Sequence, residues 1–382
     1  MKDSIIKVMF AAVFVTILIP CSAPHAAAST PAFGPPGSLV NFQRIAAPPH
    51  ASAWRVRYVS TGLDGKPIEV GGVVIAPDSP GQNRAVVGYA HGTTGITDAC
   101  APSARDPKFK LMTGLEDMIA HGLVVAATDY PGLGTEGVHP YLVGISEGRA
   151  VLDSVRAARH IAAARASARF IPWGYSQGGH ASLFAGQLAS SYAPELKLVG
   201  IGAGAPPTDL YETIKFHIDQ NRNKILAAYL LASWSDVYRL PLDRVLDSRS
   251  MRVLRLAART CLITKFDTIV AAFHNLNLGN KFLNERMHQN EAWNKRFQDN
   301  APGITPATPY FIAQGLTDTI VPPQDTVRYV KRACAGGDRV DYAPLAGMGH
   351  LTADPDAAKL AVAWMTQRFE EKSAPSNCGS LP

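Results

Sequence analysis

Short apolar runs alternate with segments of helical periodicity along most of the chain. Six runs have the length of buried strands, at residues 85–90, 123–128, 168–175, 196–204, 308–315 and 339–345. Five segments show helical spacing of apolar residues, at residues 106–121, 143–165, 177–190, 324–335 and 354–372. Strands that alternate with helices usually pair in parallel, so the pattern predicts an α/β fold with a mostly parallel central sheet and helices on both faces.

The beginning of this region departs from the alternation. Residues 54–60 and 67–77 flank an Asp64-Gly65 pair, which is a turn signal. We therefore expect an antiparallel hairpin ahead of the parallel strands. Residues 29–50 are rich in Pro, Ala and Ser, and are expected to form an extended lead-in.

A long helical block interrupts the alternation after residue 206. Residues 207–302 contain helical stretches, such as 223–238 and 250–266, but no convincing strand. The simplest interpretation is one α/β domain that carries this block as a helical lid or cap. The expected parts are 29–206 and 303–372 for the domain, 207–302 for the cap, and 373–382 for a C-terminal tail.

The apolar residues of the cap allow two interpretations. The segment from Ile225 to Tyr238 is too apolar for a solvated face. Its residues could form only the core of the cap. Alternatively, some of them line a ligand-binding cavity, for which Leu230, Leu231 and Trp234 are the candidates.

The first residues have the pattern of an export signal. Two lysines precede an apolar run over residues 8–20, and small residues follow it. The run is short for a transmembrane helix. We expect residues 1–28 to be a signal peptide that is removed after Ala27 or Ala28, which makes the protein secreted or periplasmic.

Composition and charge narrow the class of protein further. Hydrophobic residues make up 47% of the chain and charged residues 18%, which is typical of a globular protein and excludes a disordered one. The net charge is +6, but Lys and Arg are scattered along the sequence. Because nucleic-acid faces usually show clustered basic residues, we expect no nucleic-acid partner.

One pentapeptide has the form of a nucleophile turn. Gly174-Tyr175-Ser176-Gln177-Gly178 matches G-x-S-x-G, in which a serine stands on a sharp turn between a strand and a helix. It follows the apolar run 168–175 and opens the helical segment 177–190, as that motif requires. The alternative is an ordinary glycine-rich turn, but the context favours Ser176 as a nucleophile.

A serine hydroxyl needs a base to remove its proton, and the base needs an acid to orient it. His350 follows the last apolar run in a glycine-rich segment and is the predicted base; His91 and His180 fit this role less well. Asp318 directly follows the run 308–315 and is the predicted acid. Asp341 is the alternative, although it begins a strand instead of ending one. The order Ser, acid, His is that of α/β-hydrolases.

The negative charge that develops during acyl transfer needs preorganised donors. One expected donor is the backbone N–H of Gln177, the residue after the nucleophile. The other should come from the loop after an early strand, which here reads His91-Gly92-Thr93-Thr94-Gly95. Thr93 is the favoured donor and Thr94 the alternative.

Five segments together resemble the secretory lipase family of fungi and bacteria. They are HGTTG at 91–95, TDYPGLG at 128–134, GYSQGG at 174–179, GLTDTIVPP at 315–323 and GMGH at 347–350. The resemblance extends from about residue 50 to about residue 370. It implies an α/β-hydrolase fold with a lid, lipase or esterase activity through Ser176, Asp318 and His350, two disulfides and no metal. The implied substrate is a small-molecule or lipid ester, with transient contact at a lipid–water interface.

Four cysteines remain after removal of the signal: Cys100, Cys261, Cys334 and Cys378. In an exported protein they indicate two disulfides, for which three pairings exist. We favour Cys100 with Cys261, which would tie the region after the early strand to the cap, and Cys334 with Cys378, which would fasten the tail. No C-x-x-C or His-rich cluster indicates a metal site, and no cofactor is expected.

Other functions use the same residues. A serine peptidase of this fold would need an anchor for a peptide terminus, for which Asp219, Glu285 and Glu291 of the cap are available. An acyltransferase would replace water by an alcohol acceptor. A non-catalytic binding protein could retain the fold, but the presence of Ser176, Asp318 and His350 argues against it.

Overall fold

The computed structural model describes residues 33–381, apart from 107, 222, 244, 247 and 279–289. The predicted signal peptide, residues 1–28, lies outside the described residues. In the described part of the chain, no helix combines the length and the apolar character needed to cross a membrane.

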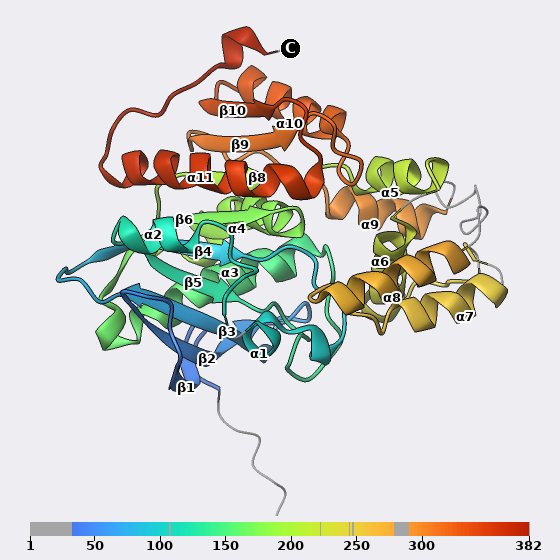
Figure 1. Cartoon of the computed structure of the whole chain (residues 1–382), viewed down its shortest axis with the longest axis horizontal. Helices are drawn as coiled ribbons and strands as arrows, with labels where there is room; N and C mark the ends of the chain where they lie inside the picture. Colours follow the sequence, from blue (N-terminus) through green and yellow to red (C-terminus); the bar gives the residue numbers. More distant parts are fainter. Residues whose placement is uncertain are drawn as a thin grey trace, which may run out of the picture. The chain divides into compact units, whose positions relative to one another are not determined.

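A ten-stranded mixed sheet forms the centre of the fold (Figure 1). Its strands are β1 Leu39–Ile45, β2 Ala51–Thr61, β3 Pro67–Pro77, β4 Arg84–Ala90, β5 Val124–Thr128, β6 Ala166–Tyr175, β7 Lys197–Leu198, β8 Ile201–Gly204, β9 Tyr310–Gly315 and β10 Val340–Leu345. The order is β1-β2-β3-β5-β4-β6-β8-β9-β10, and β7 pairs with β6. The β1–β2, β2–β3 and β3–β5 pairs are antiparallel, and all later pairs are parallel. The predicted α/β fold is confirmed.

Helices cover both faces of this sheet. Those of the α/β domain are α1 Pro102–Arg105, α2 Leu115–Ala120, α3 Gly144–Arg159, α4 Gln177–Tyr192, α10 Pro323–Ala335 and α11 His350–Phe369. Residues of α3 and α4 pack into one buried apolar cluster with the sheet, and residues of α2 and α11 pack into another on the opposite face. The alternation of side chains along each strand is what lets one sheet support separate apolar clusters on its two faces.

Five helices lie between β8 and β9 in the described part of the chain. They are α5 Leu210–Asp219, α6 Lys224–Tyr238, α7 Ser248–Ala257, α8 Lys265–Asn277 and α9 Glu291–Asp299, and Figure 1 shows them grouped together. We call them the cap. They share an apolar cluster of their own, which includes the fully buried Trp234 and Trp293.

Several predicted elements differ from the observed ones. The helix expected over 106–121 is restricted to α2, because Gly114 adopts a left-handed conformation (φ 83°) that starts a new helix there. The single helix expected over 250–266 is two helices, since the Thr264 side chain caps the start of α8. The lead-in contains an unpredicted edge strand, β1, whose mostly exposed side chains carry no apolar pattern.

Candidate active site

Ser176 stands on a strained turn between β6 and α4. Its backbone has φ 58° and ψ −121°, a conformation that L-residues rarely adopt. The Ser176 N–H donates to the Gly204 carbonyl (2.8 Å), and the Ser176 carbonyl accepts from His180 N–H (3.1 Å). These two bonds hold the turn, so the hydroxyl is presented at the carboxyl end of the parallel strands.

The glycines of the pentapeptide allow this turn to pack. A Cβ atom at either Gly174 or Gly178 would collide with the carbonyl oxygen of Ala90, at the end of β4. Only glycine permits so close an approach of β4, β6 and α4. The G-x-S-x-G pattern therefore reflects backbone packing around Ser176 as much as chemistry.

His350 and Asp318 form a close pair at the same edge of the sheet. His350 Nδ1 lies 2.6 Å from Asp318 Oδ2, and both residues are buried. The other carboxylate oxygen, Oδ1, accepts from the backbone N–H groups of Ile320 (2.7 Å) and Val321 (2.9 Å). The carboxylate is thus fixed by its own loop, with one oxygen left to orient the imidazole.

His350 differs from expectation in its local structure. It is the first residue of α11, which begins four residues before the expected start at Asp354. Its backbone carbonyl accepts from the Tyr175 hydroxyl (2.8 Å). The His350 imidazole is therefore carried by the first residue of a helix, and that helix end is hydrogen-bonded to the residue before Ser176. Asp341, the alternative acid, lies within β10 and pairs in register with Phe311 of β9.

The loop after β4 lies against both Ser176 and the cap. Thr93 and Thr94 line a cavity together with Ser176. The Thr93 hydroxyl is hydrogen-bonded to the Tyr141 hydroxyl (2.9 Å), and the Thr94 carbonyl accepts from Leu262 N–H of the cap (2.8 Å). Gln177 opens α4, where the first N–H groups of a helix lack intrahelical acceptors. The geometry is compatible with donors at Gln177 and Thr93.

A buried polar network lies beneath the nucleophile turn and was not predicted. Glu147 of α3 accepts through Oε1 from the Gln177 side-chain amide (2.7 Å) and from Leu142 N–H (3.0 Å). Its Oε2 lies 2.9 Å from His180 Nδ1, and His180 Nε2 lies 2.9 Å from the Asn300 carbonyl. Because that carbonyl can only accept, Nε2 carries a proton and donates it to this bond. In sequence, Glu147 has no signal that separates it from other helical glutamates.

A cavity of about 530 Å³ opens beside Ser176 and His350. Residues from two cap helices and the intervening segment line it: Ile225 and Leu226 of α6, Leu262, and Thr268, Ala271, Ala272 and Asn275 of α8. A second, narrower pocket also reaches Ser176 and is lined by Leu230, Ile214 and His217. Leu231 and Trp234, the other candidates for acyl contact, lie instead in the apolar cluster of the cap.

His217 connects the cap to the loop that carries Asp318. Its Nε2 lies 2.6 Å from the Ile320 carbonyl, so this nitrogen carries the ring proton. Burial lowers the pKa of His217 to about 4, because a charged imidazole would lose its hydration there. The side chain is therefore neutral at ordinary pH. Sequence reasoning missed this residue, which has no motif around it.

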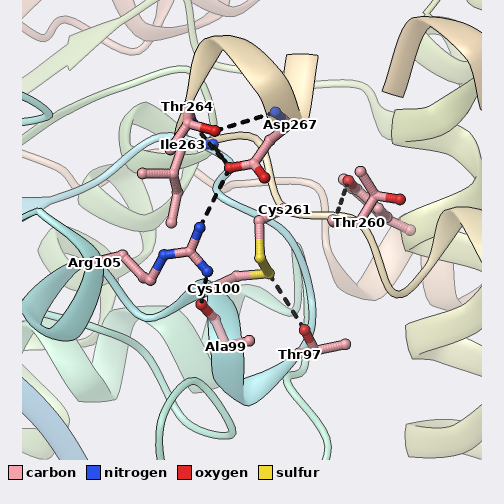
Figure 2. The surroundings of a disulfide bond; sticks show 10 residues. Thr97, Ala99, Cys100, Arg105, Thr260, Cys261, Ile263, Thr264 and Asp267 are labelled. Carbon is pink, nitrogen blue, oxygen red and sulfur yellow. Dashed lines mark hydrogen bonds and ion pairs between the residues drawn. A yellow bond between two sulfur atoms is a disulfide. The ribbon is translucent and has the colours of Figure 1, made fainter. Parts of the chain in front are cut away.

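Two disulfides are present, and they are the pairs favoured from the sequence. Figure 2 shows Cys100, in a short 3-10 helix after the Thr93 loop, bonded to Cys261 in the cap segment between α7 and α8. Arg105 of α1 also forms an ion pair with Asp267 of α8 (3.7 Å). The second disulfide joins Cys334 of α10 to Cys378 in the tail.

Two of the three acidic residues considered as a peptide anchor, Asp219 and Glu291, lie away from the site in the described part of the chain. Asp219 and Glu291 are exposed, and neither lines the cavities beside Ser176. Glu285 lies outside the described residues. In the described part of the chain, no three His, Cys, Asp or Glu side chains are grouped so that they could hold a metal ion.

Comparison with known proteins gives matches over most of the chain. A sequence model described as secretory lipase matches residues 111–377. Lipase A of Moesziomyces aphidis is 24% identical over 366 residues, covering 87% of this chain and 75% of that protein. A relative from Mycobacterium tuberculosis, 27% identical over 85% of this chain and 75% of its own length, is named "Probable inactive lipase". Among solved structures, Candida antarctica lipase A in its closed state has a TM-score of 0.75 at 20% identity, covering 90% of this chain and 85% of that one.

Proposed function

The chain belongs to the secretory lipase family of lipase and esterase hydrolases, and from this premise we propose that it is a secreted serine hydrolase of carboxylic esters. Its nucleophile is Ser176, its base is His350, and its orienting acid is Asp318. The export pattern of residues 1–28 and the two disulfides support a location outside the cytoplasm.

The reaction follows from the positions of these groups. Ser176 Oγ attacks the ester carbonyl carbon while His350 Nε2 takes its proton, and Asp318 stabilises the imidazolium that forms. The N–H groups of Gln177 and Thr93 hold the oxyanion. The intermediate collapses, and the alcohol leaves with the proton from His350. Water, activated by the same base, then attacks the acyl-enzyme and releases the acid.

One observation carries this proposal. The 2.6 Å contact between His350 Nδ1 and Asp318 Oδ2 leaves Nε2 as the nitrogen available to the serine, and Ser176 and His350 line one cavity. This geometry matters because family membership does not by itself guarantee activity, as the name of the mycobacterial relative indicates.

The cavity supports an ester with an apolar acyl chain. Ile225, Leu226 and Ala271 of the cap line it, and the cap covers the carboxyl edge of the strands, where ligands bind in α/β folds. The charged residues that line the cavity, Lys110 and Asp354, belong to the α/β domain, and the cap contributes none to the lining of this cavity. We therefore assign acyl recognition to the cap face of the cavity.

The test is hydrolysis of nitrophenyl acetate, octanoate and palmitate by the mature chain. Ser176→Ala should lower kcat/KM on the order of 10⁴-fold or more, since the covalent step is lost. Ser182→Ala is the matched control, because Ser182 is buried on the same helix and has no hydrogen-bond partner among the described residues. It should retain activity and fold.

A second measurement separates the alternatives. A fluorophosphonate should label the parent protein and not Ser176→Ala. If this protein were a non-catalytic binding protein, the parent would not be labelled either. If an added alcohol captured most of the acyl group in preference to water, acyl transfer would replace ester hydrolysis as the proposed function.

A further inference from the structure

We propose that Lys110, Thr113 and Asp354 form a subsite for the alcohol part of the ester, and that this subsite selects alcohols with a free hydroxyl group near the ester bond, as in monoesters of glycerol. The three residues line the α/β-domain side of the catalytic cavity, whereas the apolar side chains assigned to the acyl chain come from the cap. The inference rests on the proposed ester hydrolysis and adds the chemical class of the leaving alcohol.

The reaction itself places the leaving alcohol beside His350. When the tetrahedral intermediate collapses, the bond between the former carbonyl carbon and the alkoxy oxygen breaks, and His350 Nε2 gives its proton to that oxygen. The alkoxy oxygen must therefore lie within hydrogen-bond reach of this imidazole. Cavity-lining side chains that directly adjoin His350 consequently meet the alcohol part of the ester.

Asp354 adjoins His350 on α11 and offers a carboxylate oxygen to the cavity. Positions four apart lie on one side of a helix, and both residues line the cavity. Asp354 Oδ2 accepts from the Thr113 hydroxyl (2.8 Å), whereas Oδ1 has no partner among the described residues. Burial raises the pKa of Asp354, and the bond from Thr113 acts in the opposite direction by favouring the carboxylate. The side chain is only partly buried, so Oδ1 remains available to a ligand hydroxyl.

Lys110 adds a cation to the same lining. It is exposed, and in the described part of the chain it forms no ion pair with Asp354 or with another carboxylate. A charged ligand would be attracted by one of these two groups and repelled by the other. A neutral hydroxyl group suits both, because it can donate to a carboxylate and accept from an ammonium group. An alkyl alcohol would displace water from them without replacing its hydrogen bonds, which opposes binding.

The segment that precedes α2 and carries these polar groups is held in place by hydrogen bonds. Leu111 N–H donates to Asp106 Oδ2 (2.7 Å), and the Leu111 carbonyl accepts from the Tyr89 hydroxyl (3.0 Å). Two residues later, the bond from Thr113 to Asp354 joins the segment to α11. Because these groups are positioned before a ligand arrives, little conformational entropy is lost when they bind it, and selection between alcohols is stronger.

The experiment compares 1-monobutyrylglycerol with propyl butyrate, both dissolved below their solubility limits. The two esters share the acyl group and a three-carbon alcohol, and they differ only in the hydroxyl groups of glycerol. Release of butyrate in a pH-stat gives kcat and KM for each. We expect the parent to favour the glycerol ester about tenfold in kcat/KM, mainly through KM, because the hydrogen bond to the carboxylate forms in the bound substrate as well as in the transition state. Equal values for the two esters would overturn the proposal.

Variants of the subsite should change this ratio of kcat/KM values. Asp354→Leu should remove the preference for the glycerol ester. Asp354→Asn, which can still accept from Thr113, should lower the preference severalfold because the charge is lost; it provides the test if the leucine variant does not fold. Lys110→Gln should also lower the preference. Asp356→Asn, at an exposed carboxylate on the same helix, is the matched control and should keep the parent ratio.

The ratio distinguishes recognition of the alcohol from a purely structural role. If Asp354 served only to hold the segment that contains Thr113, its replacement would lower hydrolysis of both esters by the same factor, and that result would overturn the proposal. A third ester, 6-O-butyrylglucose, tells glycerol from a sugar as the source of the hydroxyl group. The polyol ester whose kcat/KM falls more in Asp354→Leu is the one that the subsite fits better.

A binding measurement separates this inference from the proposed hydrolysis. NMR titration of Ser176→Ala gives the dissociation constants of both butyrate esters without turnover, and we expect about tenfold tighter binding of the glycerol ester. Adding Asp354→Leu to this variant should remove the difference. If the parent hydrolysed neither ester while this difference was observed, the proposed hydrolysis would fail and the alcohol subsite would stand. Equal binding of the two esters by Ser176→Ala would reject the subsite, whatever the activity of the parent.

Discussion

The α/β domain beneath Ser176 and the cap above it are stabilised in different ways. Beneath the serine, Glu147, Gln177 and His180 are buried and bonded to one another, and each constrains the turn. The cap instead has a core of stacked aromatic rings, with Trp234 against Trp293. The comparison indicates that the α/β domain fixes the positions of the residues around Ser176, whereas the cap determines the shape and the lining of the cavity beside it.

The two regions meet through a few specific links. The Cys100–Cys261 disulfide is one, the bond from His217 to the Ile320 carbonyl is another, and the bond from His180 to the Asn300 carbonyl is a third. The predictions below test the catalytic pair, two of these links and the network beneath Ser176, from the largest expected effect to the smallest.

Asp318→Asn should have the largest effect, about a 10⁴-fold loss of kcat. The amide oxygen can still accept from Ile320 and Val321, but the amide nitrogen then faces His350 Nδ1 as a donor and favours the wrong tautomer. Steady-state kinetics on nitrophenyl acetate measure the loss. Asp341→Asn, at the alternative acid, is the control; a comparable loss there would reject the assignment of Asp318.

Removal of the Cys100–Cys261 disulfide, with both residues changed to Ser, should lower the free energy of unfolding by about 5 kcal/mol. In a chain-entropy description, the sequence separation of 161 residues sets this value, and the 44-residue separation of Cys334 and Cys378 corresponds to about 4 kcal/mol.

Removal of one disulfide or the other should give proteins that differ more in activity than in stability. Only the first lies near the Thr94 carbonyl and its bond to Leu262 N–H. Urea titrations and kinetics on both double variants make the comparison. If loss of the tail disulfide lowered activity as much as loss of the cap disulfide, the cap would have no special link to the site.

Glu147→Ala should cost about 4 kcal/mol of unfolding free energy, because it leaves His180, Leu142 N–H and the Gln177 amide without their acceptor. Glu147→Gln should remain close to the parent. Its oxygen accepts from the two amides, and its nitrogen donates to a neutral His180 that keeps its bond to Asn300. Urea titrations of the two variants test this, and equal losses would contradict the hydrogen-bond network assigned around Glu147.

His217→Gln should reduce the acid sensitivity of the protein. The unfolded histidine takes up a proton near pH 6.5, but burial lowers the folded pKa to about 4, so acidification through this window favours unfolding. The parent should lose about 3 kcal/mol more stability than the variant between pH 7.5 and pH 3.5. Asp153 and Asp325, whose pKa values burial raises to about 6, act in the opposite direction but are present in both proteins.

Urea titrations across this pH range measure the difference. His160→Gln, at an exposed histidine, is the control and should follow the parent curve. If the unfolding free energies of the parent and of His217→Gln changed with pH in parallel, His217 would not take up a proton on unfolding as described.

The local sequence determined much of the fold because its signals are local. The alternation of apolar runs predicted the strands of the sheet, and the Asp64-Gly65 turn predicted the β2–β3 hairpin, where Thr61 pairs with Pro67. The G-x-S-x-G pattern located the turn at Ser176. Its glycines are needed because no other residue allows the backbones of β4, β6 and α4 to approach so closely, so the pattern by itself predicts this packing.

The sequence could not predict the elements that depend on distant contacts. The strand β1 lacks a regular alternation of apolar and polar residues, and it is held in the sheet by its pairing with β2. The start of α11 at His350 is supported by the Tyr175 hydroxyl, 175 residues away. Glu147 and His217 read as ordinary helical residues, since their roles arise from partners on other elements.

The cap shows most clearly the difference between what the local sequence predicts and what distant contacts decide. Its apolar residues predicted a helical block with a core, but not that α6 and α8 would face the cavity while Leu231 and Trp234 pack inward. Local periodicity fixes which face of a helix is apolar, but tertiary packing alone decides which neighbour, if any, covers that face.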